Sequence, residues 1–424
     1  MPQSKAYDQA IGHLLAFRPD VVDSTGQAMA ADPDDIMARA LRAYLGLMSS
    51  ERGDAMSAWR YIQPLSGRND QEARHLAAIR AWVEGDWHAA SRILDEQLAE
   101  HPADFMALAV GHQLDFFLGE AGNLRDRVGR SLIHLDPGHP ARGYLKGMEA
   151  FGLEESGDYA AAEAAGLEAL DLNSDDVWAN HAVAHVMEMQ GRVADGIAFL
   201  DARKPHWSGD NLLNIHTSWH RAIFALEGET PTEALALFDE VMGGPDALAA
   251  ALPMVDGTSL LWRLHLDGVD VGGRWGAMAD AWAEKDTSPW YVFNDLHALL
   301  ALIGAERMEA ARALVARQED LIRTQGTTGT NPLAVASAGL AVARGLLAFG
   351  ERDFAAAVTH LAPVRHQLSI FGGSHAQRDV FQRTLVVAAV RSGQSALARN
   401  LCNERLSLRP TSVWAGLRLT EVGA

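Results

Sequence analysis

Two pairs of histidines recur along the chain with the spacing of an α-helix. His181 and His185 are four residues apart, as are His216 and His220, and Glu188 follows the first pair by three residues. Residues three and four apart lie on one face of a helix, so each pair presents its imidazoles together. Imidazole binds transition metals and also acts as a general base near neutral pH. The spacing therefore predicts a site with one of these two chemistries.

The two pairs are also separated by one structural repeat. The differences 216 − 181 and 220 − 185 are both 35 residues. In stacked helical hairpins the first helices lie side by side, with about 8–10 Å between their axes. We therefore expect the four imidazoles and Glu188 to converge on one patch. His112 and Asp115 occupy the first-helix position of an earlier repeat, and we expect Asp115 to face the same patch.

Two later motifs, FNDLH and SHAQRD, have a similar density of polar side chains. They contribute a second set of candidates: Asp295, His297, His375, Gln377, Arg378 and Asp379. A strongly curved solenoid would bring this set across an internal polar pocket to the histidines. We state this closure as a hypothesis.

A metal site is the first interpretation. Neutral imidazoles at i and i+4 can share one ion, so His181, His185, His216 and His220 are candidate ligands of a divalent transition metal such as zinc, iron or nickel. Glu188 or Asp295 would supply an oxygen ligand or would anchor a ring. The run HAVAH lacks the glutamate of the HExxH signature, so no zinc-peptidase motif is present.

General acid/base or hydrolytic chemistry without a metal is the second interpretation. Its candidate catalytic residues are His181, His185, Glu188, His216, His220, Asp256, Asp295, His297 and Asp379. Its candidate substrate contacts are Asp115, Trp219, Trp262, Arg263, His375 and Arg378. Arg263 or Arg378 would clamp an anionic substrate, and Trp219 and Trp262 would wall the pocket. Ser259 is a weaker candidate nucleophile because no GxSxG elbow, phosphate loop or dinucleotide fingerprint is present.

A structural role is the third interpretation, because buried polar groups regularly join neighbouring helices by hydrogen bonds. Against it, five ionisable groups on one helix surface are costly to bury for packing alone. A functional site and a structural role therefore both stay open as explanations of the histidine set.

Helical hairpins must position these residues. The segments that start at His75, Tyr144 and Gly339 each contain a helix-period run, a polar turn with glycine, and an alanine-rich second run. The turn glycines Gly53, Gly85, Gly122, Gly157, Gly191 and Gly228 are 32, 37, 35, 34 and 37 residues apart. The tetratricopeptide period is about 34 residues. No strand pattern stands out, so we predict an all-α, tetratricopeptide-like solenoid.

Further expectations concern the turns and the domains. We expect each turn glycine to adopt the left-handed conformation that ends a helix. The wider spacing of Gly268, Gly304, Gly350 and Gly393 predicts longer loops between the later hairpins. Residues 1–30 are predicted to cap one continuous array over 31–424, with a candidate break near 242–258.

Composition narrows the functional classes. The net charge of −19 disfavours nucleic acid and anionic lipid as partners. No stretch approaches about 18 uninterrupted apolar residues, so we expect no membrane span. The N-terminus lacks the apolar core of a secretion signal, and the single cysteine, Cys402, excludes an internal disulfide framework. A cytoplasmic location is the expectation.

Several motifs together resemble a known family. The runs HAVAHVMEMQGR, NIHTSWHRAIFALEGE, DGTSLLWRLHLDG, FNDLHALLAL and GGSHAQRDVFQRTL, in this order, are similar to the tetratricopeptide repeat protein 38 family. The resemblance covers most of the chain. It implies a tetratricopeptide-like fold and no assigned reaction.

Two functions therefore remain in competition. In the first, the solenoid encloses a small polar ligand at the His/Asp/Glu/Arg set. In the second, the concave groove holds a peptide or a protein partner. Peptide grooves of this fold typically carry Lys, Arg and Asn clamps for carboxylates, whereas the first-helix positions here carry His, Glu and Trp. That difference favours an enclosed site.

Overall fold

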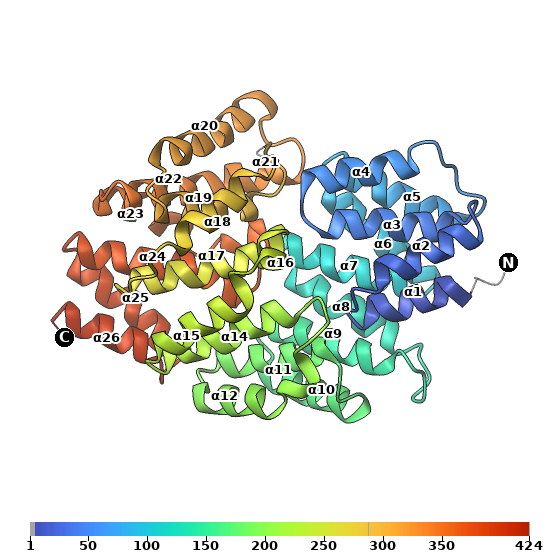
Figure 1. The fold of residues 1–424 in the computed structure, drawn as a ribbon, viewed down its shortest axis with the longest axis horizontal. Coiled ribbons are helices and arrows are strands. Elements are labelled where there is room, and N and C mark those ends of the chain that lie inside the picture. The colour runs from blue at the N-terminus through green and yellow to red at the C-terminus, as the bar shows by residue number, and fades with distance from the viewer. Residues whose placement is uncertain (1–4, 287, 424) are drawn as a thin grey trace. The chain divides into compact units, whose positions relative to one another are not determined.

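The computed structural model describes residues 5–286 and 288–423, and over these residues it contains only helices, turns and irregular segments. The chain divides into two compact units (Figure 1). Unit 1 contains Met1–Val186 and Arg203–Asn214, and unit 2 contains Met187–Ala202 and Ile215–Ala424. The all-α prediction is confirmed for the described part of the chain.

Unit 1 is a series of antiparallel helical hairpins. Its helices are α1 (Lys5–Leu15), α2 (Val21–Ala31), α3 (Ile36–Met48), α4 (Arg52–Ile62), α5 (Asp70–Val83), α6 (Trp87–Glu100), α7 (Phe105–Leu118), α8 (Ala121–Leu132), α9 (Arg142–Glu155), α10 (Tyr159–Leu172), most of α11 (Val177–Met189) and α13 (Lys204–Trp207). Successive helices pack together, as in the hairpins α3/α4, α5/α6 and α9/α10. The hairpins predicted from His75 and Tyr144 are therefore confirmed.

Unit 2 begins within the last turn of α11, so Glu188 belongs to it while His181 and His185 belong to unit 1. Its long helices are α12 (Val193–Ala202), α14 (Asn214–Glu227), α17 (Ala251–Leu266), α18 (Arg274–Ala283), α19 (Val292–Gly304), α20 (Met308–Gln325), α22 (Leu340–Gly350), α23 (Phe354–Leu361), α24 (His375–Arg391), α25 (Ser395–Leu408) and α26 (Val413–Glu421). Helix α17 packs against both α19 and α24, which makes it the centre of the unit (Figure 1).

Short helical pieces lengthen the repeats of unit 2. They are α15 (Pro231–Leu237), α16 (Pro245–Leu248), α21 (Thr330–Ala334), the π-helical turns η1 (Phe238–Met242) and η2 (Val335–Gly339), and the 3₁₀ turns η3 (Ala362–Val364) and η4 (Leu368–Phe371). The wide spacing of the later glycines thus reflects inserted helical turns as well as loops. The segment 242–258 contains α16 and the start of α17, and the predicted break there stays a prediction.

Side-chain caps explain where many helices begin. The carboxylates of Asp35, Asp86, Asp104, Asp158 and Asp353 each accept a hydrogen bond from a backbone N–H of the first turn. Such a cap satisfies a donor that has no partner within the helix and stabilises the helix by about 1 kcal/mol. The predicted N-terminal cap includes α1 and α2, and its residues 1–4 lie outside the described part of the chain.

The prediction for the turn glycines is correct at some turns and wrong at others. Gly85, Gly157 and Gly191 have positive φ angles of 91°, 83° and 70°. In the later turns next to Gly228 and Gly304, however, the left-handed residues are Glu229 and Glu306. Gly304 is small for another reason, because a Cβ there would lie 2.3 Å from the Trp275 ring. That glycine allows close helix packing rather than a left-handed turn.

One helical segment differs from the composition-based expectation. Thr330–Gly350 is long and apolar enough to cross a membrane by length and composition. Counting only uninterrupted apolar residues missed it. Half of its most apolar window is buried inside the protein, and a core helix passes the same test, so the segment is weak evidence for a membrane span.

Candidate functional site

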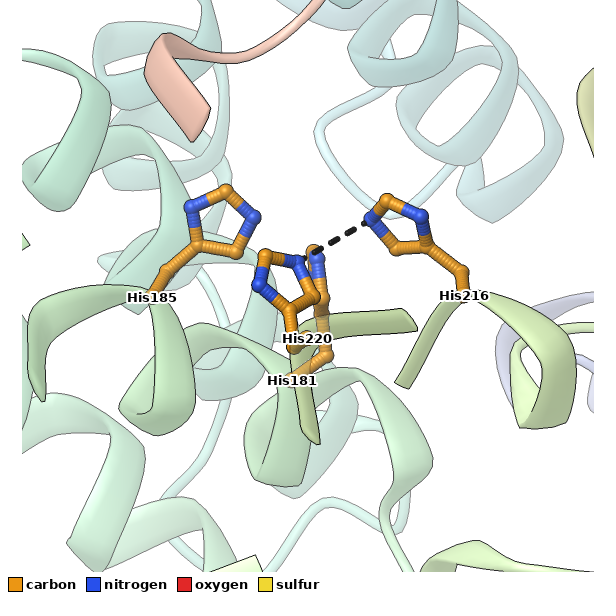
Figure 2. A group of neighbouring side chains, drawn as sticks. All are labelled: His181, His185, His216 and His220. Atoms are coloured by element: carbon orange, nitrogen blue, oxygen red, sulfur yellow. Dashed lines mark hydrogen bonds between the residues drawn. The ribbon is translucent and has the colours of Figure 1, made fainter. Parts of the chain in front are cut away.

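The two histidines of α14 form a polar pair in unit 2. The Nε2 atoms of His216 and His220 lie 3.3 Å apart, as the dashed line in Figure 2 marks. Their rings meet edge to face with 4.8 Å between the centroids. His220 is fully buried, whereas the His216 side chain keeps 16% of its surface exposed. The pair thus has one solvent-facing member.

A carboxylate holds the other nitrogen of each ring. His216 Nδ1 lies 2.9 Å from an oxygen of Asp256 on α17, and His220 Nδ1 lies 2.7 Å from an oxygen of Glu188 on α11. Both carboxylates are nearly buried. A carboxylate only accepts hydrogen bonds when ionised, so Nδ1 of each ring carries a proton. In the neutral rings the lone pairs therefore lie on the two facing Nε2 atoms.

The late motif SHAQRD reaches this site through Gln377. Its side chain donates from Nε2 to Asp256 Oδ1 at 3.4 Å, while its Oε1 accepts from the backbone N–H of Ser374. Gln377 is thus part of the capping box that starts α24. Gln377 therefore links this motif to Asp256, and the closure of the whole motif onto the histidines stays a prediction.

The aromatic and hydroxyl candidates lie on α14 and α17. The Trp219 indole stacks on the His216 ring at 5.4 Å and donates from Nε1 to Ser259 Oγ at 3.1 Å. Ser259 Oγ also accepts from Arg263 at 2.8 Å, so its oxygen is engaged by two donors. Trp262 is fully buried and donates to Thr384 of α24. Trp219 therefore borders the histidines, whereas Trp262 joins two helices of the core.

The remaining residues of SHAQRD have separate roles. Burial raises the pKa of Asp379, but Arg405 and Arg383 outweigh burial and hold that pKa well below its usual range. Both guanidinium groups bind the Asp379 carboxylate directly. Arg378 donates to the backbone carbonyl of Gly373, before α24, and His375 is exposed at the first turn of that helix.

His297 on α19 is buried and Asp295 is partly buried, and their surroundings differ. His297 lies among Phe293 and Phe381 and donates from Nδ1 to the Phe293 carbonyl at 2.8 Å. Burial lowers the pKa of His297 to about 4, so the ring is neutral at pH 7. Burial raises the pKa of Asp295 to about 7, although nearby Arg317 and Gln318 oppose the change.

The other predicted pair, His181 and His185, lies on α11 within unit 1 (Figure 2). The two rings are 4.4 Å apart, and His185 Nδ1 lies 3.4 Å from a carboxylate oxygen of Glu154 on α9. Phe151 packs against both rings. This pair therefore also has a carboxylate and an aromatic neighbour. That both pairs share one patch stays a prediction.

In unit 1, hydrogen bonds from neighbouring side chains hold the carboxylate of Asp115. Arg127 donates to both of its oxygens, at 2.7 and 3.0 Å, and Ser91 donates at 2.7 Å. Burial still raises the pKa of Asp115 despite the nearby guanidinium. Its neighbour His112 lies 3.2 Å from the Met148 carbonyl, and burial lowers its pKa to about 3.

The sequence reasoning missed a second buried chain of polar groups in unit 1. His75 Nε2 donates to Asp104 Oδ2 at 3.0 Å, and the Tyr44 hydroxyl lies 3.1 Å from His75 Nδ1. Gln71 and Gln97 donate to the same Asp104 oxygen at 2.8 Å. Of these residues, only Gln71 and His75 have a spacing that the sequence shows as a pair, because they lie four residues apart on α5.

The solved structures to which the chain is similar share little sequence with it. No family model matches the chain. The chain is similar to a structure of the APC/C heterotetramer Cut9–Hcn1, with a TM-score of 0.48 and 12% identity over 99% of this chain and 70% of that one. It is also similar to a monomeric mutant of IFIT1 with Gppp-AAAA, with a TM-score of 0.43 and 12% identity over 99% of each chain.

A third similar structure is Naa15/Naa10 bound to HypK-THB, with a TM-score of 0.28 and 12% identity over all of this chain and 66% of that one. At these values the similarities support no inference about activity or partners.

Proposed function

We propose that this tetratricopeptide-like protein binds a divalent transition-metal ion between Nε2 of His216 and Nε2 of His220. The ion then holds a water molecule and a small polar ligand, which suits metal-assisted hydrolysis. We propose that the protein acts in the cytoplasm. We also propose that it belongs to the tetratricopeptide repeat protein 38 family, whose motifs its sequence resembles.

The separation of the two Nε2 atoms carries the proposal. Two lone pairs that face each other at 3.3 Å repel unless a cation lies between them. Zinc–nitrogen bonds of about 2.0–2.1 Å at a tetrahedral angle place two nitrogens about 3.3–3.4 Å apart. The observed distance matches that edge of the tetrahedron. The separation of the two nitrogens thus fits one ion.

The carboxylates support the same proposal. Metal-bound histidines almost always donate their second ring nitrogen to a carboxylate, a carbonyl or water, which orients the ring and strengthens its donor atom. Asp256 and Glu188 accept from Nδ1 of His216 and His220, as this pattern requires. Gln377 in turn orients Asp256.

The number of protein ligands suggests the chemistry. Two imidazoles from unit 2 leave open positions on a tetrahedral ion, and catalytic metal sites keep at least one position open. An ion held by His216 and His220 would lower the pKa of a bound water toward neutrality, which is the chemistry that hydrolysis needs. The partly exposed edge of His216 gives a small polar ligand a route to the ion.

Elemental analysis of the protein purified without a histidine tag tests the proposal. We expect about one zinc, iron or nickel ion per chain, and its loss in a His216→Ala, His220→Ala double variant. The exposed His134 supplies the matched control, since His134→Ala should keep the metal. A wild-type protein that stays metal-free after incubation with each ion would refute the metal site. A proton shared by the two rings, and acid/base chemistry, would then explain the distance.

A groove in unit 1 favours a second candidate, a scaffold that binds a protein partner. The groove has a volume of about 770 Å³ and is lined by α1, by the turn before α7 and by the start of α9. Asp8, Glu100 and Asp104 contribute to its lining, and the described lining residues include neither Lys nor Arg. A basic peptide would fit this charge. Binding of such a peptide that survives Asp8→Lys would contradict this use of the groove.

A further inference from the structure

Arg263 of α17 is a buried cation that has no carboxylate partner among the residues that the structure describes. Its side chain has 1% of its surface exposed. Nη1 donates to the Ser259 carbonyl at 3.2 Å and to Ser259 Oγ at 2.8 Å, and Nη2 donates to the Ala376 carbonyl at 2.7 Å. Within the described residues, Nε has no hydrogen-bond partner. Among the described residues, the hydrogen bonds of the guanidinium group thus go to neutral oxygens only.

Burial makes this arrangement costly. It lowers the pKa of Arg263 to about 10, although attraction by Asp379 and Glu188 opposes the change. Arg263 therefore remains charged at pH 7. The Asp379 oxygens already bind Arg383 and Arg405, and Glu188 accepts from His220. Buried charges in proteins are normally paired, because an unpaired one loses several kcal/mol of hydration.

The guanidinium group and the two candidate metal ligands share one aromatic neighbour, Trp219. Its Cζ atom is 5.3 Å from the centroid of the Trp219 ring. The same indole lies 5.4 Å from the His216 ring and 4.8 Å from the His220 ring. One aromatic side chain therefore contacts the cation and both candidate metal ligands.

We infer that Arg263 selects an anionic ligand, namely a small molecule with a carboxylate at one end and a metal-binding group at the other. This inference rests on the proposed metal site. Arg263 has five N–H donors, and its three observed hydrogen bonds leave two of them for the carboxylate. A carboxylate accepts two such bonds in parallel, and charge-assisted bonds of this kind are about twice as strong as neutral ones.

Hydroxamates test the inference, because they bind transition metals through two oxygens. The probe pair is acetohydroxamate and the monohydroxamate of succinate, which differ by a terminal carboxylate. Each is titrated into the full-length protein loaded with Co²⁺, and the visible absorption of the ion reports binding. We expect the carboxylated probe to bind roughly tenfold to a hundredfold more tightly, as a hydrogen bond to a charged group predicts.

Substitutions then assign the preference to Arg263. Arg263→Met should bring the affinity ratio of the two probes close to one, and Arg263→Lys should reduce the ratio while keeping the positive charge. Arg344→Met, at an exposed arginine of α22, should leave the ratio as in the wild type. If Arg263→Met does not fold, as judged by circular dichroism, the ratio in Arg263→Lys decides.

The outcomes separate the inference from its premise. Absence of a Co²⁺ spectrum in the wild type would refute the metal site and the inference with it. A Co²⁺ spectrum with equal affinities for both probes would overturn the role of Arg263 alone. A preference for the carboxylated probe that survives in Arg263→Lys and Arg263→Met unchanged would likewise overturn that role.

Discussion

The facing nitrogens of His216 and His220 lie 3.3 Å apart, and a buried carboxylate holds the opposite nitrogen of each ring. The proposed metal ion accounts for this relationship if both Nδ1 atoms donate to their carboxylates and both Nε2 atoms carry lone pairs. The carboxylates come from α11 and α17, so residues of three helices fix the distance.

Removal of either carboxylate should weaken the metal site. We expect Asp256→Ala and Glu188→Ala each to reduce metal affinity about tenfold to a hundredfold, as for other residues that orient metal-bound histidines. Asp256→Asn should have a smaller effect, since an amide oxygen can still accept from Nδ1. Competition with a metal chelator measures the affinities. Asp246→Ala, at an exposed aspartate, is the control. Unchanged affinity in Asp256→Ala would remove the proposed role of that carboxylate.

A second prediction concerns the contribution of the α11 histidines to metal affinity. The 35-residue offset predicts that His181 and His185 serve the same ion as His216 and His220. A His181→Ala, His185→Ala double variant should then bind the metal at least tenfold more weakly than the wild type in the same chelator assay. Wild-type affinity in this variant would confine the site to unit 2 and would end the four-histidine hypothesis.

The buried ion pair of unit 1 predicts a strong and asymmetric effect on stability. Arg127→Met leaves the Asp115 carboxylate buried without its partner, which should lower the free energy of unfolding by about 3–5 kcal/mol. The double variant Asp115→Leu, Arg127→Met removes both charges and should recover part of that loss. Urea unfolding of the wild type, both single variants and the double variant provides the measurement. Additive losses would show that the pair is not coupled.

Asp176 predicts a dependence of stability on pH. Its Oδ1 caps α11 by accepting from two backbone N–H groups, while its Oδ2 is buried and has no partner among the described residues. Burial raises the pKa of Asp176 to about 7. Between about pH 4 and pH 7 the folded state therefore binds more protons than the unfolded state, and stability falls as the pH rises.

Asp176→Asn should abolish this contribution, because the amide keeps the cap without a charge. The stability gain of the variant over the wild type should be small near pH 4 and should grow to at most about 4 kcal/mol above pH 7, at about 1.4 kcal/mol for each pKa unit. Urea midpoints at pH 4.5, 6 and 8 measure the gain. A gain that is constant with pH would contradict the raised pKa.

The sequence by itself determined the features that depend on local spacing. The i, i+4 histidine pairs and the hairpin period follow from the 3.6-residue turn of the α-helix, which no distant residue alters. The all-α hairpins were therefore predictable. The caps at Asp86 and Asp158 follow from the same local chemistry. The turn glycines were only partly predictable, because Gly304 responds to the Trp275 ring 29 residues earlier in the chain.

Only the tertiary structure decided which groups meet across helices. Asp256 reaches His216 from 40 residues away, Gln377 reaches Asp256 from 121, and Asp104 reaches His75 from 29. Such partners depend on how each helix is rotated and placed against its neighbours. Side-chain packing in the core sets that rotation, and no local period of the sequence encodes it.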